Sequence, residues 1–226
     1  MPGYGQFCPV AKAMEVLDQR WTMLVIRELL TGSTRFNELR RGLTRMSPAL
    51  LSARLRSLEH SGLIDRVLVE GTPEYHLTEA GRELSVVVDA LSAWGLRWVP
   101  ELGDEDLDPH LLMFDIHRKI PADAWPRRRT VVAFRFEDLV GKAAAWWLVV
   151  EDGEVDLCDA DPGFEVAATV STRLRTLTRI WRGDLPWSGA IREHAVTIQG
   201  VPTVRRALPD LIGHGRHPLT PIARAG

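Results

Sequence analysis

The feature that most constrains the fold is helical periodicity over the first hundred residues, interrupted by a single hairpin signal. Apolar side chains recur at three- and four-residue spacings through residues 9–62, the pattern of helices that bury one face. Two short extended runs follow, at 64–69 and 74–77, and the Gly and Pro of residues 70–73 predict a turn between them. A final long helix is expected over residues 79–99. This order predicts a small helical domain that carries a two-stranded hairpin.

Two of the expected helices are joined by a very short turn. The first is a short segment near residues 36–42, and the second begins at Ser47-Pro48, where a hydroxyl N-cap precedes a proline at the first helical position. The second helix buries Leu51 and Leu55. Two closely linked helices followed by a hairpin predict a winged helix-turn-helix, which presents its second helix to the major groove of DNA.

Charge is distributed unevenly along the chain. The whole sequence has a formal net charge of −2, but residues 31–60 contain six arginines and two glutamates, a local charge of +4. Such a cationic stripe is a candidate phosphate-binding surface, and the alternative is a solvated helix face.

The predicted recognition helix assigns DNA contacts to specific residues. Arg56 is expected to contact a guanine, Ser52 a base or a phosphate, and Ser47 a phosphate at the helix N-terminus. Other arginines are expected to position the DNA backbone, whereas Glu70 and Glu74 on the hairpin repel phosphate. The predicted DNA-binding residues are Arg35, Arg40, Arg41, Ser47, Pro48, Ala49, Ser52, Ala53, Arg54, Arg56 and Arg66.

Motifs in this half of the chain also resemble a known family. Residues 7–99 resemble the HxlR-type winged-helix transcriptional regulators. The resemblance implies a dimeric DNA-binding regulator whose first and last helices pair across a two-fold axis. The motifs that carry it are Cys8-Pro9-Val10-Ala11, Asp18-Gln19-Arg20-Trp21-Thr22, Arg27-Glu28-Leu29-Leu30, Arg35-Phe36-Asn37-Glu38-Leu39, Ser47-Pro48, Leu51-Ser52-Ala53-Arg54-Leu55, Ser61-Gly62-Leu63-Ile64 and Leu77-Thr78-Glu79-Ala80-Gly81.

The second half mixes strands with helices. Residues 101–109, acidic and poor in apolar side chains, are expected to link a DNA-binding and dimerisation domain at 1–100 to a second domain at 110–226. Asp152-Gly153 predicts a tight hairpin, and Ser171 is expected to cap a helix that ends at Trp181. Strands are expected at 130–136, 144–150, 155–158, 165–170 and 196–199, with further helices at 111–120 and 203–212.

This order of elements resembles the sterol-carrier-protein fold. The similarity rests on residues 147–150, 152–155, 181–185 and 196–200. It implies an α+β protein, in which the winged helix-turn-helix is followed by a sterol-carrier-like α/β sandwich with an apolar cavity. An apolar effector is the expected ligand there, and ordinary core packing is the alternative explanation for the tryptophans. The candidate ligand-binding residues are Trp125, Trp146, Trp147, Trp181 and Trp187.

Other kinds of site have weaker signals. Cys8 matches a cysteine that senses oxidants in some relatives, and the alternative is a small apolar residue in the dimer interface. His214 and His217 have a ligand-like spacing but no third partner nearby, so no metal site and no cofactor is expected. No catalytic motif is present, so we do not expect an enzyme.

These observations predict a sequence-specific transcriptional regulator that binds, as a homodimer, double-stranded DNA with an inverted-repeat operator. An apolar small molecule is expected to modulate it. One alternative is a second domain that only supports dimerisation, and another is a lipid-handling protein. The longest apolar run, residues 143–150, is far too short to cross a bilayer, and the two cysteines lie far apart, so the cytoplasm is the expected location.

Overall fold

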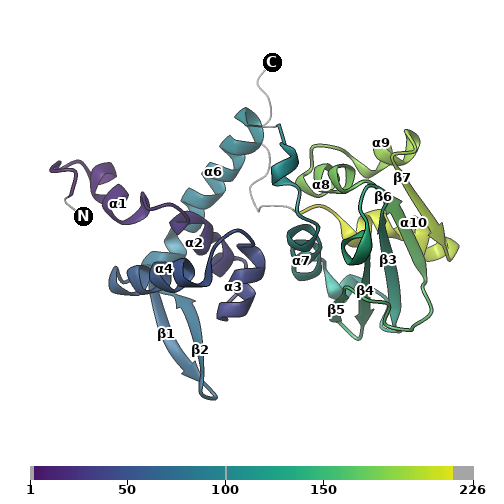
Figure 1. The fold of residues 1–226 in the computed structure, drawn as a ribbon, viewed down its shortest axis with the longest axis horizontal. Helices are drawn as coiled ribbons and strands as arrows, with labels where there is room; N and C mark the ends of the chain where they lie inside the picture. The colour runs from purple at the N-terminus through teal and green to yellow at the C-terminus, as the bar shows by residue number, and fades with distance from the viewer. Residues whose placement is uncertain (1–2, 100, 216–226) are drawn as a thin grey trace. The chain divides into compact units, whose positions relative to one another are not determined.

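A computed structural model describes residues 3–99 and 101–215 (Figure 1). These residues form two compact units that divide near residue 100. The protein is of the mixed α+β type, with a winged helix-turn-helix in the first unit and a sheet-rich second unit. The first unit contains α1 (Pro9–Leu17), α2 (Thr22–Leu30), α3 (Phe36–Gly42), α4 (Pro48–His60), β1 (Ile64–Val69), β2 (Thr72–Leu77), α5 (Glu79–Glu83) and α6 (Ser85–Trp98).

The first unit is built around one apolar core beneath α4. Val25 and Ile26 of α2 and Leu39 of α3 are fully buried there with Leu51 and Leu55 of α4. The helix-period pattern of the sequence therefore assigns the buried faces of α2, α3 and α4 correctly, whereas α1, which shows the same pattern, buries none of its residues in the single chain. Burial of these side chains supplies the apolar free energy that holds α4 against α2 and α3.

The hairpin between β1 and β2 is tighter than the sequence suggests. Glu70 and Gly71 alone form the turn, with φ of 52° and 79°, as in the two-residue turns that suit twisted antiparallel strands. Val69 pairs directly with Thr72, so Thr72 and Pro73 already belong to β2. The expected turn at residues 70–73 was therefore two residues too long.

The prediction of a single long helix over residues 79–99 is wrong. It is divided at Leu84, whose N–H donates to the carbonyl of Gly81 only three residues back, as in a tight 3-10 turn. Gly81 itself packs closely against Leu63, because a Cβ at this glycine would lie 2.1 Å from the Leu63 carbonyl oxygen. The short helix α5 therefore packs against the start of the hairpin, and α6 follows it in the chain.

The second unit contains a five-stranded sheet and four α-helices within its described residues. The strand order is β5-β4-β3-β6-β7, with β3 and β6 parallel and every other pair antiparallel. The elements are η1 (Asp104–Asp106), α7 (Pro109–Lys119), η2 (Ala122–Ala124), β3 (Thr130–Phe136), η3 (Gly141–Ala144), β4 (Ala145–Glu151), β5 (Glu154–Cys158), β6 (Ala168–Thr172), α8 (Leu174–Arg182), α9 (Trp187–Arg192), β7 (Val196–Gly200) and α10 (Pro202–Ile212), where η denotes a short 3-10 helix.

The hairpin predicted at Asp152-Gly153 is confirmed. Both residues have positive φ, 50° and 83°, and Glu151 pairs with Glu154 across the turn. The helix expected from Leu111 instead begins at Pro109, because the Asp108 carboxylate accepts hydrogen bonds from the two N–H groups of His110 and Leu111.

The expected cap at Ser171 is wrong. Ser171 lies inside β6, paired with Thr197 of β7, and α8 begins only at Leu174. The side chain that caps α8 comes from a distant loop, since Asp138 Oδ1 accepts the Leu174 N–H at 2.9 Å. A contact between residues 36 positions apart leaves no local sequence signal.

The four helices bury one face of this sheet. Side chains from α7, α8, α9 and α10 form a single core with Val132, Phe134 and Phe136 of β3. The alternate residues Val131 and Ala133 belong to a smaller cluster on the opposite face.

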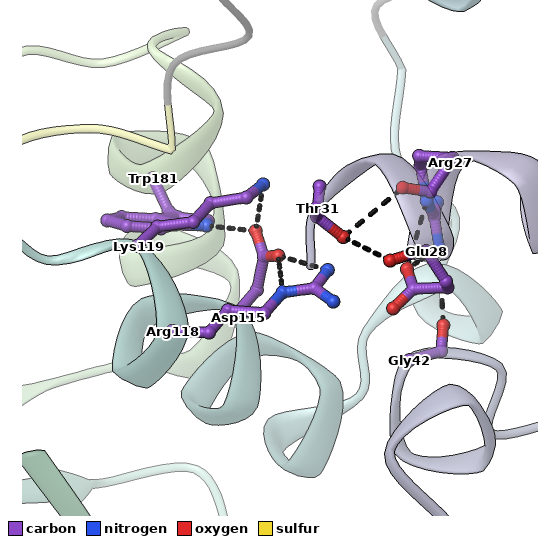
Figure 2. A network of polar contacts seen from close by, with 8 residues as sticks. All are labelled: Arg27, Glu28, Thr31, Gly42, Asp115, Arg118, Lys119 and Trp181. Carbon is purple, nitrogen blue, oxygen red and sulfur yellow. Dashed lines mark hydrogen bonds and ion pairs between the residues drawn. The ribbon is translucent and has the colours of Figure 1, made fainter. Parts of the chain in front are cut away.

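Asp115 links two of these helices through a polar network (Figure 2). Its carboxylate contacts Arg118 Nη2 at 2.7 Å, Lys119 Nζ at 2.9 Å and Trp181 Nε1 at 2.7 Å, which joins α7 to α8. Burial raises the pKa of Asp115, but the two cations and the indole hydrogen bond outweigh it and hold that pKa below its ordinary value. The network therefore keeps a largely buried carboxylate ionised.

Candidate DNA-binding surface

Helix α4 presents one apolar face to the core and the opposite face to solvent. Ser47 is its N-cap and accepts the Leu50 N–H at 3.3 Å through Oγ, and Pro48 occupies the first turn. Ala49, Ala53 and Arg56 are exposed on the side away from the core. An exposed helix face with small residues and one arginine has the dimensions and chemistry to enter a major groove.

Several cations lie on α4 and on the neighbouring elements. Arg40 and Arg41, at the end of α3, are exposed, as is Arg66 on β1. Arg54 is half-buried on the flank of α4, and its Nε has no hydrogen-bond partner among the described residues. The structure thus brings most of the predicted backbone-contact arginines to the neighbourhood of α3, α4 and the hairpin.

Arg35 differs from the others because it is already paired. Its Nε lies 3.1 Å from Glu74 Oε1 on β2, and the other carboxylate oxygen lies 3.1 Å from His76 Nε2. The main chains of Arg35 and Glu74 also form an isolated β-bridge. The sequence identifies the two opposite charges but not their contact, since 39 positions separate them.

A cleft of about 550 Å³ lies between α3, α4 and the hairpin. Ser52, Arg35 and Arg41 line it, and so do Asn37 and Tyr75, which the sequence analysis did not single out. Tyr75 reaches this position because its N–H donates to the Thr34 carbonyl at 2.8 Å. The sequence predicts that Tyr75 lies on a strand. It does not predict that this strand contacts the start of α3.

A buried ion pair supports the helices beneath this surface. Glu28 is fully buried, and its Oε1 accepts from Arg27 Nη2 at 2.6 Å (Figure 2). The same Arg27 nitrogen donates to the Gly42 carbonyl at 3.2 Å, which ties α2 to the end of α3. A side chain at Gly42 would collide with the Glu28 carboxylate. The pair therefore fixes where α3 ends and the turn to α4 begins.

Cys8 is the N-cap of α1 and is half-buried in the single chain. The backbone N–H groups of Ala11 and Val10 point at its sulfur and lower the pKa of the thiol. The nearby cation Lys12 is held by Glu15 at 3.0 Å. The helix N-terminus, more than Lys12, is what favours the thiolate.

The five candidate tryptophans do not surround one space. All are buried, but Trp147 belongs to the cluster on the opposite face of the sheet from Trp146 and the other three. The indole N–H groups of Trp125 and Trp147 lack a hydrogen-bond partner among the described residues. Trp187 donates to the Gly213 carbonyl and Trp146 to that of Ala143.

Two other features concern metals and membranes. His214 Nδ1 lies 3.2 Å from the Ile180 carbonyl oxygen, and His217 lies outside the described residues. Within residues 3–99 and 101–215, no three His, Cys, Asp or Glu side chains converge as metal ligands. None of the helices described there has the length and apolar character to span a membrane.

Comparisons with known proteins find relatives of the first part of this chain. A model of the HxlR-like helix-turn-helix family matches residues 16–102. The HTH-type transcriptional regulator YvaP of Bacillus subtilis is 37% identical over 98 residues, which are 42% of this chain and 91% of YvaP. The Synechocystis regulator sll1512 is 37% identical over 100 residues, 43% of this chain and 74% of the relative.

A mycobacterial relative is longer than the matched region. The HTH-type transcriptional regulator Rv3095 of Mycobacterium tuberculosis is 44% identical over 94 residues, which are 40% of this chain and 59% of Rv3095. YvaP is matched over nearly its whole length at well above 30% identity. This chain therefore belongs to the HxlR-like helix-turn-helix family of DNA-binding transcriptional regulators.

Proposed function

We propose that this regulator recognises a specific DNA sequence through the exposed face of α4. The observation that supports this most strongly is the position of Arg56, exposed with Ala49 and Ala53 opposite the buried leucines of a capped helix. A guanidinium there can donate two hydrogen bonds to a guanine edge, while the alanines allow close approach. The residues proposed to contact the DNA backbone are Ser47, Arg40, Arg41, Arg54 and Arg66, and Ser52 is proposed to contact a base or a phosphate.

Replacement of Arg56 tests this assignment. Arg56→Ala is expected to cost about 1–3 kcal/mol of operator affinity and to relax base preference at one position per half-site. Binding-site selection with wild type and variant measures both effects. Arg192→Ala is the matched control, because it removes an exposed arginine from α9 in the other unit. Equal losses on operator and random DNA for Arg56→Ala would reassign Arg56 to the phosphates.

We further propose that the protein acts as a homodimer. Val87, Leu91, Trp94 and Trp98 lie at heptad-like spacings along α6, and all four are exposed in the single chain. A stripe with this spacing is the pattern of a helix that pairs with a second helix. Helix α1 adds to the exposed apolar surface, since none of its residues is buried.

A charge placed in this stripe tests dimerisation. Leu91 is 53% exposed, so Leu91→Glu leaves the single-chain core intact, but it places a carboxylate in the proposed seam. Sedimentation velocity at micromolar concentration is expected to show a dimer for wild type and a monomer for the variant. Val140→Glu is the control, because Val140 is 90% exposed on the other unit. If Leu91→Glu remains a dimer, the dimer interface does not use this stripe of α6.

An apolar effector in the second unit is the remaining part of the proposal. The support is the resemblance to sterol-carrier proteins together with the buried indole N–H of Trp125, which lacks a partner among the described residues. A ligand with a hydrogen-bond acceptor at this position would accept from the indole N–H and remove the free-energy cost of an unpaired buried donor. Because Trp147 faces the other side of the sheet, the proposed site uses Trp125, Trp146, Trp181 and Trp187.

Titration of the full-length protein with a fatty acid tests the effector. Tryptophan quenching reports binding, and operator affinity measured in parallel reports coupling, expected at about 5–150-fold. Binding without a change in operator affinity favours the lipid-handling alternative. If no candidate ligand binds, the second unit is left with a supporting role in dimerisation.

A further inference from the structure

The contact between Glu74 and Arg35 joins the hairpin to the helix-turn-helix. Glu74 Oε1 lies 3.1 Å from Arg35 Nε, and the glutamate side chain is only 13% exposed, against 55% for the arginine. The second oxygen of Glu74 contacts His76 Nε2 at 3.1 Å. Because the carboxylate is mostly withdrawn from solvent, its charge is screened less by salt than that of a fully exposed glutamate.

Main-chain contacts hold the two residues side by side. The Tyr75 N–H donates to the Thr34 carbonyl at 2.8 Å, and the main chains of Arg35 and Glu74 bridge. Glu38 Oε2 accepts the N–H groups of Thr34 and Arg35 at 2.9 and 3.0 Å. An ion pair between groups that are already positioned loses less side-chain entropy than one between two free side chains.

Arg35 lies beside the proposed DNA-binding face of α4. It lines the same cleft as Arg41 and Ser52, beside the exposed face of α4. Sequence-independent affinity for DNA grows with the number of phosphates that cations neutralise. An arginine whose charge is already balanced by a carboxylate adds little to that number.

We propose that Glu74 limits the sequence-independent DNA affinity of this protein by holding Arg35 in an ion pair. The inference rests on the proposed DNA-binding function and assigns Glu74 a positioning role within that surface. It leaves base recognition by Arg56 unaffected. The physical effect is a smaller electrostatic contribution to binding any duplex, so that less of the protein is retained on DNA outside its operator.

Glu74→Gln in the full-length protein tests the proposal. The amide keeps the shape of the side chain and removes its charge, which frees Arg35 to contact a phosphate. Affinity for a random duplex and for the selected operator is expected to rise several-fold by the same factor. The slope of log K against log salt is expected to steepen by about 0.9 on both duplexes. Fluorescence anisotropy across a salt series measures both quantities.

Two controls separate the ion pair from general charge. Glu70→Gln makes the same charge change at the tip of the same hairpin, and it is expected to leave the salt slope nearly unchanged. The double variant Arg35→Gln/Glu74→Gln is expected to lose the gain of Glu74→Gln. A gain of equal size in Glu70→Gln, or one that persists without Arg35, would overturn the proposal.

A comparison of two arginines keeps the test decisive if Glu74→Gln fails to fold. Arg35→Gln is expected to change the salt slope little, whereas Arg41→Gln is expected to flatten it by about 0.9. Equal flattening by both variants would show that Arg35 already contacts a phosphate and would overturn the role of Glu74. If wild type binds neither duplex in a salt-dependent way, the proposed DNA-binding function itself fails.

Discussion

At the scale of single residues, the role of a side chain depends on the groups that surround it. The sequence places Arg35 and Arg41 together as cations, yet only Arg35 is balanced by Glu74. It also presents Cys8 and Cys158 as two isolated thiols, but their surroundings shift the pKa values in opposite directions. The sequence shows which residues carry a charge or a thiol. It does not show which distant residues pair, because such pairing depends on which strand packs against which helix.

The two cysteines provide a prediction about pH dependence. The N–H groups at the start of α1 lower the pKa of Cys8, whereas burial and the charges of Asp156 and Asp159 raise that of Cys158. Cys8 therefore has the larger thiolate fraction at neutral pH and should react faster with iodoacetamide. As pH rises from about 7 to 9, the alkylation rate of Cys8 should level off before that of Cys158.

Mass spectrometry of tryptic peptides after timed alkylation measures the two rates. The chain unfolded in urea is the control, since both thiols should then react at similar rates. A slower reaction at Cys8 in the native protein would instead support its place in a closed dimer interface. That result would contradict the prediction that Cys8 is an accessible thiol that senses oxidants.

Helices and strands were predictable wherever their signals are local. Ser47 caps α4 as its hydroxyl and the following proline indicate, and Asp152-Gly153 turns β4 into β5. The prediction failed at α8, where the cap is supplied by Asp138 after β3. Helix α9 (Trp187–Arg192) was missed because six residues carry too little periodicity to be detected.

The start of α8 provides a direct comparison of the two proposed caps. Asp138→Ala removes the acceptor of the Leu174 N–H and should lower the free energy of unfolding of the second unit by about 1 kcal/mol. Ser171→Ala changes a residue within β6 and should have a much smaller effect. Urea unfolding monitored by tryptophan fluorescence measures both. A larger loss in Ser171→Ala would mean that the serine caps α8 after all.

The chain combines a DNA-binding unit with a sheet-rich unit whose role is proposed. Periodicity and hairpin signals predicted the order of elements in the first unit almost completely, because its contacts are mostly between neighbours in the sequence. In the second unit the parallel pairing of β3 with β6 joins distant segments. Trp146 and Trp147 are adjacent on β4 and therefore face opposite sides of the sheet, so the expectation of one tryptophan-lined cavity exceeded what composition supports.

Footprinting of the full-length protein on its selected operator tests the central claim most directly. Two α4 helices related by a dimer axis must enter successive major grooves, so protection is expected over an inverted repeat with half-sites about 34–36 Å apart. Leu91→Glu should weaken this footprint, whereas Val140→Glu should leave it unchanged. Protection of a single asymmetric site, or equal protection of unrelated DNA, would contradict the account.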